Sequence, residues 1–231
     1  YFYAAEPGVA DFRHNASAEV KNINDWVETN TEGRIRKILG PSDLDEETRL
    51  VLTNAVYFKG TWQNPFNERA TEPREFHLSS GETKLVPTMA QKKRFVYGET
   101  TAAQALQMEY DMSALAMVII LPSDGITLAE YEKGITPEFI ERQLVELSNS
   151  EQVSVQFPKF EFERLLGLKD SLDTMGMGPA FDEDADFSAI TKTDPLVISK
   201  VIHTAFIKVD EDGTEAAAFT GPVAGAMSAS A

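Results

Sequence analysis

The chain has 231 residues, of which 42% are hydrophobic, and its 21 basic and 37 acidic residues give a formal net charge of −16 at pH 7. This length and apolar content suffice for one large domain or two small ones, and they exclude disorder by composition. The negative charge repels nucleic acids and anionic membranes, so we expect neither as a partner. The absence of cysteine excludes disulfides, thiolate chemistry and cysteine-ligated zinc.

A helix is predicted over residues 16–31, because apolar side chains recur at helical spacing in this segment. Asn15 or Ser17 can cap its start, and Gly33 can end it. The apolar residues that share one face of this helix are Val20, Ile23 and Val27.

Strand-like sequence dominates the middle of the chain. Residues 49–63, rich in Val, Leu and aromatic side chains, predict a central strand, and the uniformly apolar residues 115–122 are expected in the core. Turns are predicted at Gly81, at Gly98 and near Asp111. The remaining strand-like pieces are residues 74–79, 83–90, 94–99, 104–110 and 152–163.

The last third of the chain mixes helices and strands. Two short helices are predicted near residues 128–133 and 137–148, the second with Thr136 as its cap. Residues 165–176 also have a helical pattern, and residues 195–211 form the last long strand. Helices and antiparallel strands alternate without a βαβ rhythm, so the predicted fold class is α+β.

A search for catalytic and ligand-binding motifs finds none, so we expect no cofactor and no metal. His14, His77 and His203 lack metal-site spacing, and neither a nucleophile elbow nor a phosphate-binding loop occurs. The acidic segment 181–187 lacks the glycine and glutamate of a calcium loop, and we interpret it as an exposed turn. The basic run 92–94 is interpreted as a solvated turn rather than a heparin site. These absences favour a protein that binds over an enzyme.

The end of the chain, residues 213–231, is rich in Ala and Gly and contains neither Lys nor Arg. If it forms a strand, its small side chains suit insertion into a narrow slot between two other strands, where long side chains would clash. Gly213 then supplies the hinge, and Phe219 is expected to face solvent. A flexible linker is the alternative. One strand face would carry Thr214, Ala216, Ala218 and Thr220, and the other Glu215, Ala217 and Phe219.

The segment VDEDGTEAAAFT, residues 209–220, closely resembles the hinge of the reactive-centre loop of serpins, the large serine protease inhibitor family. Residues 54–62, NAVYFKGTW, resemble strand three of the family's central sheet, and residues 198–209 resemble strand five. Residues 22–35 resemble helix F, which lies across that sheet. The resemblance implies that residues 1–208 belong to one serpin domain body and that residues 209–231 are the hinge and reactive-centre loop.

The resemblance also assigns roles to residues. Asn54 and His203 match the polar pair of the shutter, and Trp62 matches the aromatic residue of the breach; ordinary core packing is the alternative for His203 and Trp62. Counting fourteen residues from Gly213 places the reactive bond at Met227–Ser228. The residues that match the hinge are Glu211, Asp212, Gly213, Thr214, Glu215, Ala216, Ala217 and Ala218.

In this family the loop is cut as a substrate and inserts as a new strand, and the protease stays trapped as an acyl-enzyme. The resemblance therefore implies a suicide inhibitor without catalytic residues, whose partners are a serine protease and serpin segments outside this chain. The tail lacks Lys and Arg, which favours chymotrypsin-, elastase- or subtilisin-like targets. The alternatives are a non-inhibitory serpin acting as chaperone, carrier or storage protein, and an α+β hydrolase. We expect an extracellular location, with a cytoplasmic one as the alternative.

Overall fold

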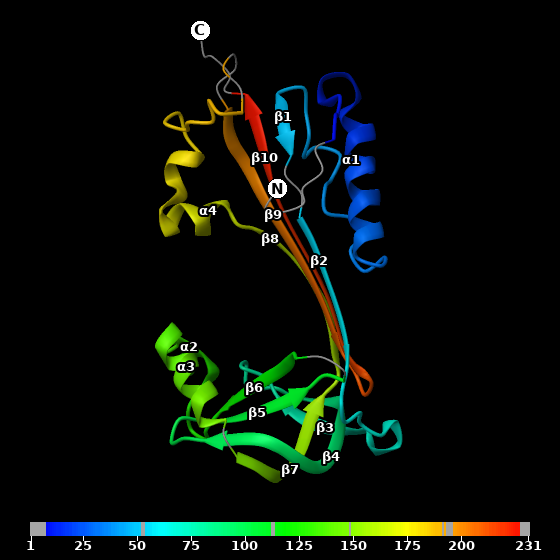
Figure 1. The fold of residues 1–231 in the computed structure, drawn as a ribbon, viewed down its shortest axis with the longest axis vertical. Helices are drawn as coiled ribbons and strands as arrows, with labels where there is room; N and C mark the ends of the chain where they lie inside the picture. Colours follow the sequence, from blue (N-terminus) through cyan, green and yellow to red (C-terminus); the bar gives the residue numbers. More distant parts are fainter. Residues whose placement is uncertain are drawn as a thin grey trace. The chain divides into compact units, whose positions relative to one another are not determined.

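The chain forms two compact units. Unit 1 comprises residues 1–58, 162–207 and 216–231, and unit 2 comprises residues 59–161 and 208–215. The α+β prediction is confirmed, because helices and mainly antiparallel strands make up both units (Figure 1). A computed structural model describes residues 8–51, 54–111, 114–147, 149–190, 192 and 196–226.

Helix α1 (Phe12–Asn30) belongs to unit 1 and begins earlier than its pattern predicts. Asp11 is the cap, since its carboxylate accepts a hydrogen bond from an amide of the first turn at 3.1 Å. The predicted caps Asn15 and Ser17 are therefore wrong, and Asn15 instead marks a kink inside the helix, with φ −133°. Gly33 follows the helix with φ +74°, a conformation that glycine adopts without strain.

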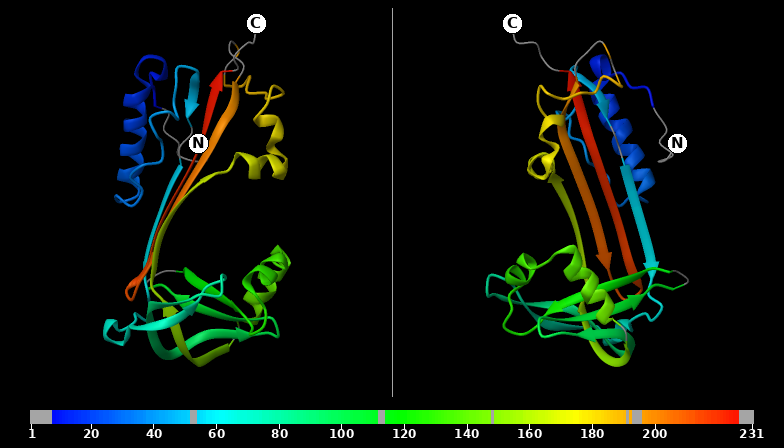
Figure 2. Two further views of the ribbon diagram at one scale, coloured as in Figure 1. Left: turned by 180° about the vertical axis from the view of Figure 1, so that it is seen from behind. Right: turned by 60° about the vertical axis from the view of Figure 1, so that its left-hand side comes forward.

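The first sheet places a strand from the end of the chain between two others (Figures 1 and 2). Strand β10 (Gly213–Ala226) pairs with β9 (Leu196–Val209) on one side and with β1 (Thr48–Val51) and β2 (Asn54–Thr61) on the other. Strand β8 (Phe160–Gly167) pairs with the other edge of β9. Strand β1 runs antiparallel to β10, with Val51 opposite Val223. The backbone groups of β10 therefore have partners on both of its sides.

The core of unit 1 lies where α1 and the segment after it cover one face of β9 and β10. Val27 and Ile35 are completely buried there, and Ala217 of β10 is only 2% exposed. Arg34 lies over the ring of Phe206 at 5.8 Å. The full buried cluster consists of Val20, Val27, Ile35, Ile38, Leu39, Leu44, Ile202, Phe206, Ala217 and Val223.

The second sheet, in unit 2, has the order β3-β4-β5-β6, and β7 also pairs with β4. Helix α2 (Leu128–Lys133) matches its prediction, and a capping box between Thr127 and Glu130 fixes its start. Thr136 caps α3 (Pro137–Glu146) as predicted. The strand bounds are β3 (Glu72–His77), β4 (Thr83–Glu99), β5 (Ala103–Glu109), β6 (Ala116–Pro122) and β7 (Asn149–Pro158).

Three local predictions for unit 2 are wrong. The basic run 92–94 is not a turn but the middle of β4, where Lys93 pairs with Val153 of β7. Gly98 is also inside β4, and a Cβ atom there would lie 2.6 Å from the Glu146 carbonyl oxygen, so close backbone approach requires the glycine. Residues 115–122 are not core, because β6 ends the order of this sheet and Leu121 is 61% exposed.

The region after β8 departs from its prediction in part. A helix was expected over residues 165–176, but residues 165–167 complete β8. Only α4 (Lys169–Leu172) is α-helical, and a π-type turn (Asp173–Met177) and a short 3-10 turn (Gly178–Ala180) follow. Gly176, at φ +99°, interrupts the helical backbone.

The core of unit 1 gives a first prediction. Ile35→Ala removes a side chain that is 0% exposed, so it should lower the free energy of unfolding by about 2–5 kcal/mol. Urea denaturation of the full-length protein measures this loss. Ile135→Ala is the matched control, because Ile135 is 44% exposed and its truncation should cost less than about 0.5 kcal/mol. Equal losses in the two variants would contradict the assignment of Ile35 to the core.

Candidate functional site

The predicted hinge begins at a tight turn between β9 and β10 in unit 2. The Asp210 amide donates to the Gly213 carbonyl at 3.0 Å, and the Asp210 carboxylate accepts from the amides of Asp212 and Gly213 at 3.1 and 3.3 Å. The Lys208 ammonium lies 2.9 Å from the same carboxylate. Burial raises the pKa of Asp210, but Lys208 and the two amides lower it more, and the net pKa is below its ordinary value. Asp210 is therefore held ionised as the anchor of the turn.

Gly213 must be glycine for a steric reason. A Cβ atom at this position would lie 2.0 Å from the carbonyl oxygen of Gly60, far inside van der Waals contact. The φ angle of Gly213 is not in the left-handed region, so backbone freedom alone does not explain the residue. The first residue of β10 is thus selected by the closeness of the Gly60 backbone.

Trp62 forms hydrogen bonds with the carbonyl groups of the turn. Its backbone amide donates to the Asp212 carbonyl at 2.8 Å, and its indole Nε1 donates to the Asp210 carbonyl at 3.0 Å. The ring is 1% exposed and stacks on Tyr110, with centroids 4.8 Å apart and planes inclined by 10°. Trp62 thus donates to two carbonyls of the turn and also packs in the core of unit 2, while its assignment to the breach stays a prediction.

Glu211 is a buried acid with two partners. The residue is 5% exposed, and its carboxylate lies 2.5 Å from the Lys159 ammonium and accepts from the Thr71 hydroxyl at 2.6 Å. The Glu211 carbonyl also accepts from the Phe66 amide at 2.9 Å. Burial raises the pKa of Glu211, but Lys159 and Thr71 lower it more, so the net pKa lies below its ordinary value of 4.5. We call Trp62, Phe66, Thr71 and Lys159 the hinge anchor.

The hinge anchor contains residues that the sequence did not indicate. Thr71 and Lys159 lie 140 and 52 positions before Glu211 and follow no motif that we could read. The sequence offered one indirect signal, since an acidic residue beside a strand must find a cation or a donor if it is buried.

The residues after Gly213 follow β10. Thr214 is 4% exposed, and its interaction with Tyr110 partly offsets the rise that burial causes in the pKa of the Tyr110 hydroxyl. Ala217 is buried in the core of unit 1, while Glu215, Ala216 and Ala218 are half-buried. The expectation for the Phe219 side chain lies outside what the structure describes.

The described part of the structure does not test the arrangement of the remaining predicted site residues. His203 lies on β9 in unit 1 and is half-buried. Asn54 begins β2, but its side chain lies outside the described part of the structure. Met227 and Ser228 also lie outside it. The shutter pair and the reactive bond therefore stay predictions.

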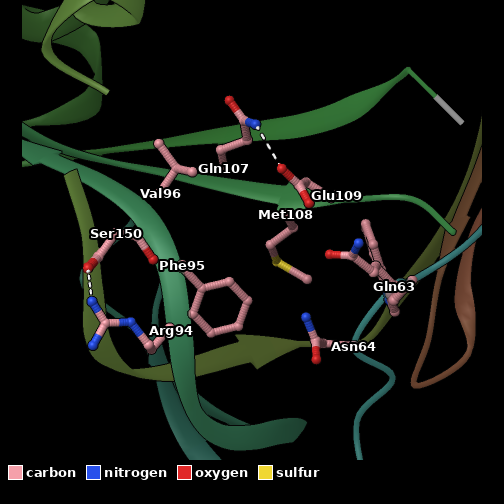
Figure 3. A pocket seen from close by; sticks show the side chains of 10 residues that line it. Gln63, Asn64, Arg94, Phe95, Val96, Gln107, Met108, Glu109 and Ser150 are labelled. Atoms are coloured by element: carbon pink, nitrogen blue, oxygen red, sulfur yellow. Dashed lines mark hydrogen bonds between the residues drawn. The ribbon is translucent and has the colours of Figure 1, made fainter. Parts of the chain in front are cut away.

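A cavity of about 230 Å³ lies beside Trp62 in unit 2 (Figure 3). Phe95 and Met108, both almost completely buried, contribute apolar side chains to its lining. Its charged groups bond to neighbours: Arg94 donates to the Ser150 carbonyl at 2.7 Å, and Glu109 accepts from Gln107 at 3.5 Å. Figure 3 shows Arg94 turned toward Ser150 and Glu109 toward Gln107 rather than toward one another, so these two groups do not form an acid–base pair.

The acidic segment 181–187 forms an exposed turn in which Asp182 and Asp186 accept hydrogen bonds from the amides of Asp184 and Ser188. Across the described ranges, no group of three or more acidic or histidine side chains is arranged to hold a metal ion. Within the same ranges, no helix is both long and apolar enough to cross a membrane.

Comparison with known proteins identifies the class that this sheet and hinge define. The family model described as "Serpin (serine protease inhibitor)" matches residues 1–231, and the chain belongs to the serpin family. Serpin B6 of Macaca fascicularis is 40% identical over 226 residues, which cover 96% of this chain and 60% of that protein. The chain thus spans about 60% of the length of this curated relative.

Two solved structures share the fold. Cleaved Serpin 42Da has a TM-score of 0.86 and 36% identity, covering 94% of this chain and 59% of that one. Reactive-loop-cleaved human thyroxine-binding globulin has a TM-score of 0.88 and 30% identity, covering 97% of this chain and 66% of that one. The resemblance inferred from the motifs is therefore confirmed over the chain.

The contacts between Glu211 and the hinge anchor predict that the stability of the protein depends on pH. Because the pKa of Glu211 is lowered by folding, its contribution to stability is complete above about pH 4.5 and is lost as the pH falls through the lower folded value. Glu211→Gln should lower the free energy of unfolding by about 1–3 kcal/mol at neutral pH. The difference in unfolding free energy between this variant and the parent should shrink below pH 4.5. Thermal unfolding of the full-length protein between pH 3 and pH 7 measures both effects. Glu75→Gln, at an exposed position of β3, should track the parent at every pH.

Proposed function

We propose that the full-length protein containing this chain inhibits serine proteases as a suicide substrate, with β10 as the strand that the cut loop forms. One observation carries the proposal. Residues of the predicted hinge and loop form a strand between β9 and the pair β1 and β2, and they do so with side chains no larger than threonine at the buried positions Thr214 and Ala217.

The chemistry belongs to the protease. Its serine attacks the carbonyl carbon of Met227, the peptide bond to Ser228 breaks, and the new amino group of Ser228 leaves with the C-terminal piece. The Met227 acyl group then stays esterified to the protease. Insertion of residues 213–226 into the sheet moves this ester, and the protease joined to it, away from the released Ser228 end, and the distorted protease cannot hydrolyse the ester. This scheme requires no catalytic residue from the serpin.

The first alternative is a non-inhibitory serpin, for example a carrier, as the name of thyroxine-binding globulin indicates for that relative. Small side chains at the buried hinge positions Thr214 and Ala217 favour the inhibitor, because a carrier does not need a loop that can enter the sheet. The second alternative, an α+β hydrolase, would turn over its substrate continuously. An inhibitor instead consumes protease activity in a fixed molar ratio.

The direct test is incubation of the full-length protein with a panel of serine proteases, followed by denaturing electrophoresis. An SDS-stable band whose mass is the sum of the protease and the cleaved serpin supports the proposal. Cleavage of the loop by every protease without such a band would favour a non-inhibitory serpin. Steady hydrolysis of a substrate by the protein alone would favour the hydrolase. The predicted extracellular location stays a prediction.

Thr214→Arg should convert the inhibitor into a substrate. The position is 4% exposed within β10, and burial of an unpaired cation there costs several kcal/mol. Since about 1.4 kcal/mol slows a step tenfold, insertion should become slower than hydrolysis of the acyl-enzyme. The stoichiometry of inhibition, measured by titration against the protease, should rise at least about tenfold.

Asp212→Arg is the matched control for that variant. Asp212 is two residues away and exposed, and its backbone amide and carbonyl make the turn contacts. The same new charge should therefore leave the stoichiometry close to that of the parent. An unchanged stoichiometry in Thr214→Arg, or equal increases in the two variants, would contradict burial of Thr214 in the inserted strand.

The expected protease specificity follows from Met227, the residue that precedes the predicted reactive bond. Residues 213–231 contain neither Lys nor Arg, and Met227 suits an apolar or narrow pocket. We therefore expect inhibition of a chymotrypsin-, elastase- or subtilisin-like protease and none of trypsin, with cleavage at Met227–Ser228 seen by mass spectrometry. Met227→Arg should transfer inhibition to trypsin. A primary cut at Ala229–Ser230 would show that the position counted from Gly213 is wrong.

A further inference from the structure

We propose that unit 1 carries a binding site for a single-chain amphipathic carboxylate, a monoanion with an unbranched apolar tail. The site is a cavity of about 450 Å³ between the segment after α1 and the adjoining ends of β8 and β9. This volume lies in the range of about 300–1,000 Å³ typical of small-molecule pockets. All of its lining residues belong to unit 1. We name it the α1–β9 pocket.

The floor of the α1–β9 pocket is apolar and consists of buried side chains. Ile38, Leu39, Val201 and Ile202 line it, and each is no more than 8% exposed. They are part of, or adjoin, the core that packs on Val223 of β10. Such a floor can bury an alkyl chain without rearrangement, at about 0.8 kcal/mol for each methylene.

A polar side chain fixes the backbone that forms one wall. The Asn24 carboxamide oxygen accepts from the amides of Ile38 and Leu39, both at 3.0 Å, and its amino group donates to the Leu39 carbonyl at 3.0 Å. The next amide, of Gly40, donates to Asp43 at 2.7 Å. Because the wall is held before any ligand arrives, the binding free energy is not spent on ordering it.

The rim of the pocket is cationic in an acidic protein. Lys37, Lys169 and Lys200 line it, and Asp43 is the single acidic lining residue, so the rim has a formal charge of 3 − 1 = +2. The whole chain carries −16. Lys200 pairs with Asp43 at 2.9 Å, and Lys37 also attracts that carboxylate, so the single Asp43 charge offsets only one of the three ammonium groups. Lys169 already lies 5.7 Å from the ring of Phe181.

Exposed apolar surface at the mouth of the pocket favours a ligand with an alkyl tail. Leu165 lines the pocket and is 58% exposed, so it offers apolar area that no described neighbour covers. An apolar floor below a rim with a formal charge of +2 is complementary to one carboxylate on one alkyl chain. A neutral alcohol would form no ion pair with the lysine ammonium groups of the rim, and these groups would repel an alkylammonium ion.

Isothermal titration of the full-length protein with monomeric decanoate tests this site without any protease. We expect saturable binding of one molecule, about 10- to 15-fold weaker binding of octanoate, which lacks two methylenes, and weaker binding of decanol and decylammonium than of decanoate. Lys37→Gln and Lys169→Gln should each weaken decanoate binding up to about fivefold. Leu165→Ser should weaken it further, at a site exposed enough to leave the fold unchanged.

Lys84→Gln is the matched control, because Lys84 is an exposed lysine of β4 in unit 2 and should not alter binding. Absence of saturable binding, equal binding of decanol and decanoate, or equal effects of Lys84→Gln and Lys37→Gln would overturn the proposal. Lys37-dependent binding to anionic phospholipid vesicles would reassign the site to a membrane lipid. None of these outcomes depends on whether the protein inhibits a protease.

Discussion

The placement of β10 between two other strands is the constraint on which the rest of the chain depends. Every backbone N–H and C=O of a strand in this position needs a partner on one side or the other, and β9, β1 and β2 supply them. The strand directly follows β9, so the chain must first reverse within residues 210–212. The reversal explains why so many hydrogen bonds converge on Asp210, Glu211 and Asp212, and why the Gly60 carbonyl leaves room only for glycine at position 213.

Apolar burial and polar contacts have different roles at β10 and at the turn before it. In unit 1, Ala217 and Val223 are buried in an apolar cluster whose stabilisation grows with the area removed from water. In unit 2, the Glu211 carboxylate is buried beside Lys159, whose side chain is 37% exposed, and the cost of desolvating the carboxylate cancels much of the attraction between the two charges. The apolar cluster therefore contributes most of the free energy, whereas the ion pair and Trp62 determine where the strand begins. A misaligned strand would leave the Glu211 carboxylate buried without its partners.

The sequence predicts those features whose cause is local. Helix α2 follows from its capping box, and β10 begins at the predicted glycine because the hinge motif is contiguous. Features that depend on partners far away in the sequence could not be predicted from local motifs. Lys93 lies in a strand because β7, about sixty residues later, pairs with β4, and Leu121 is exposed because β6 is the last strand of its order. Hydrophobicity specifies a strand but not whether the strand has a neighbour on each side.

The same reasoning explains how the proposed inhibition can rest on a segment with so few functional groups. A strand that must enter an existing sheet can carry neither long side chains nor unpaired charges on its buried positions, and Thr214 and Ala217 meet this requirement. In the proposed inhibitor, specificity then comes from loop residues outside the inserted strand, where side-chain size is unrestricted. An alanine-rich strand with few functional groups is therefore consistent with the proposed inhibition, because in that proposal the protease supplies the reacting groups and this chain supplies the free energy of strand addition.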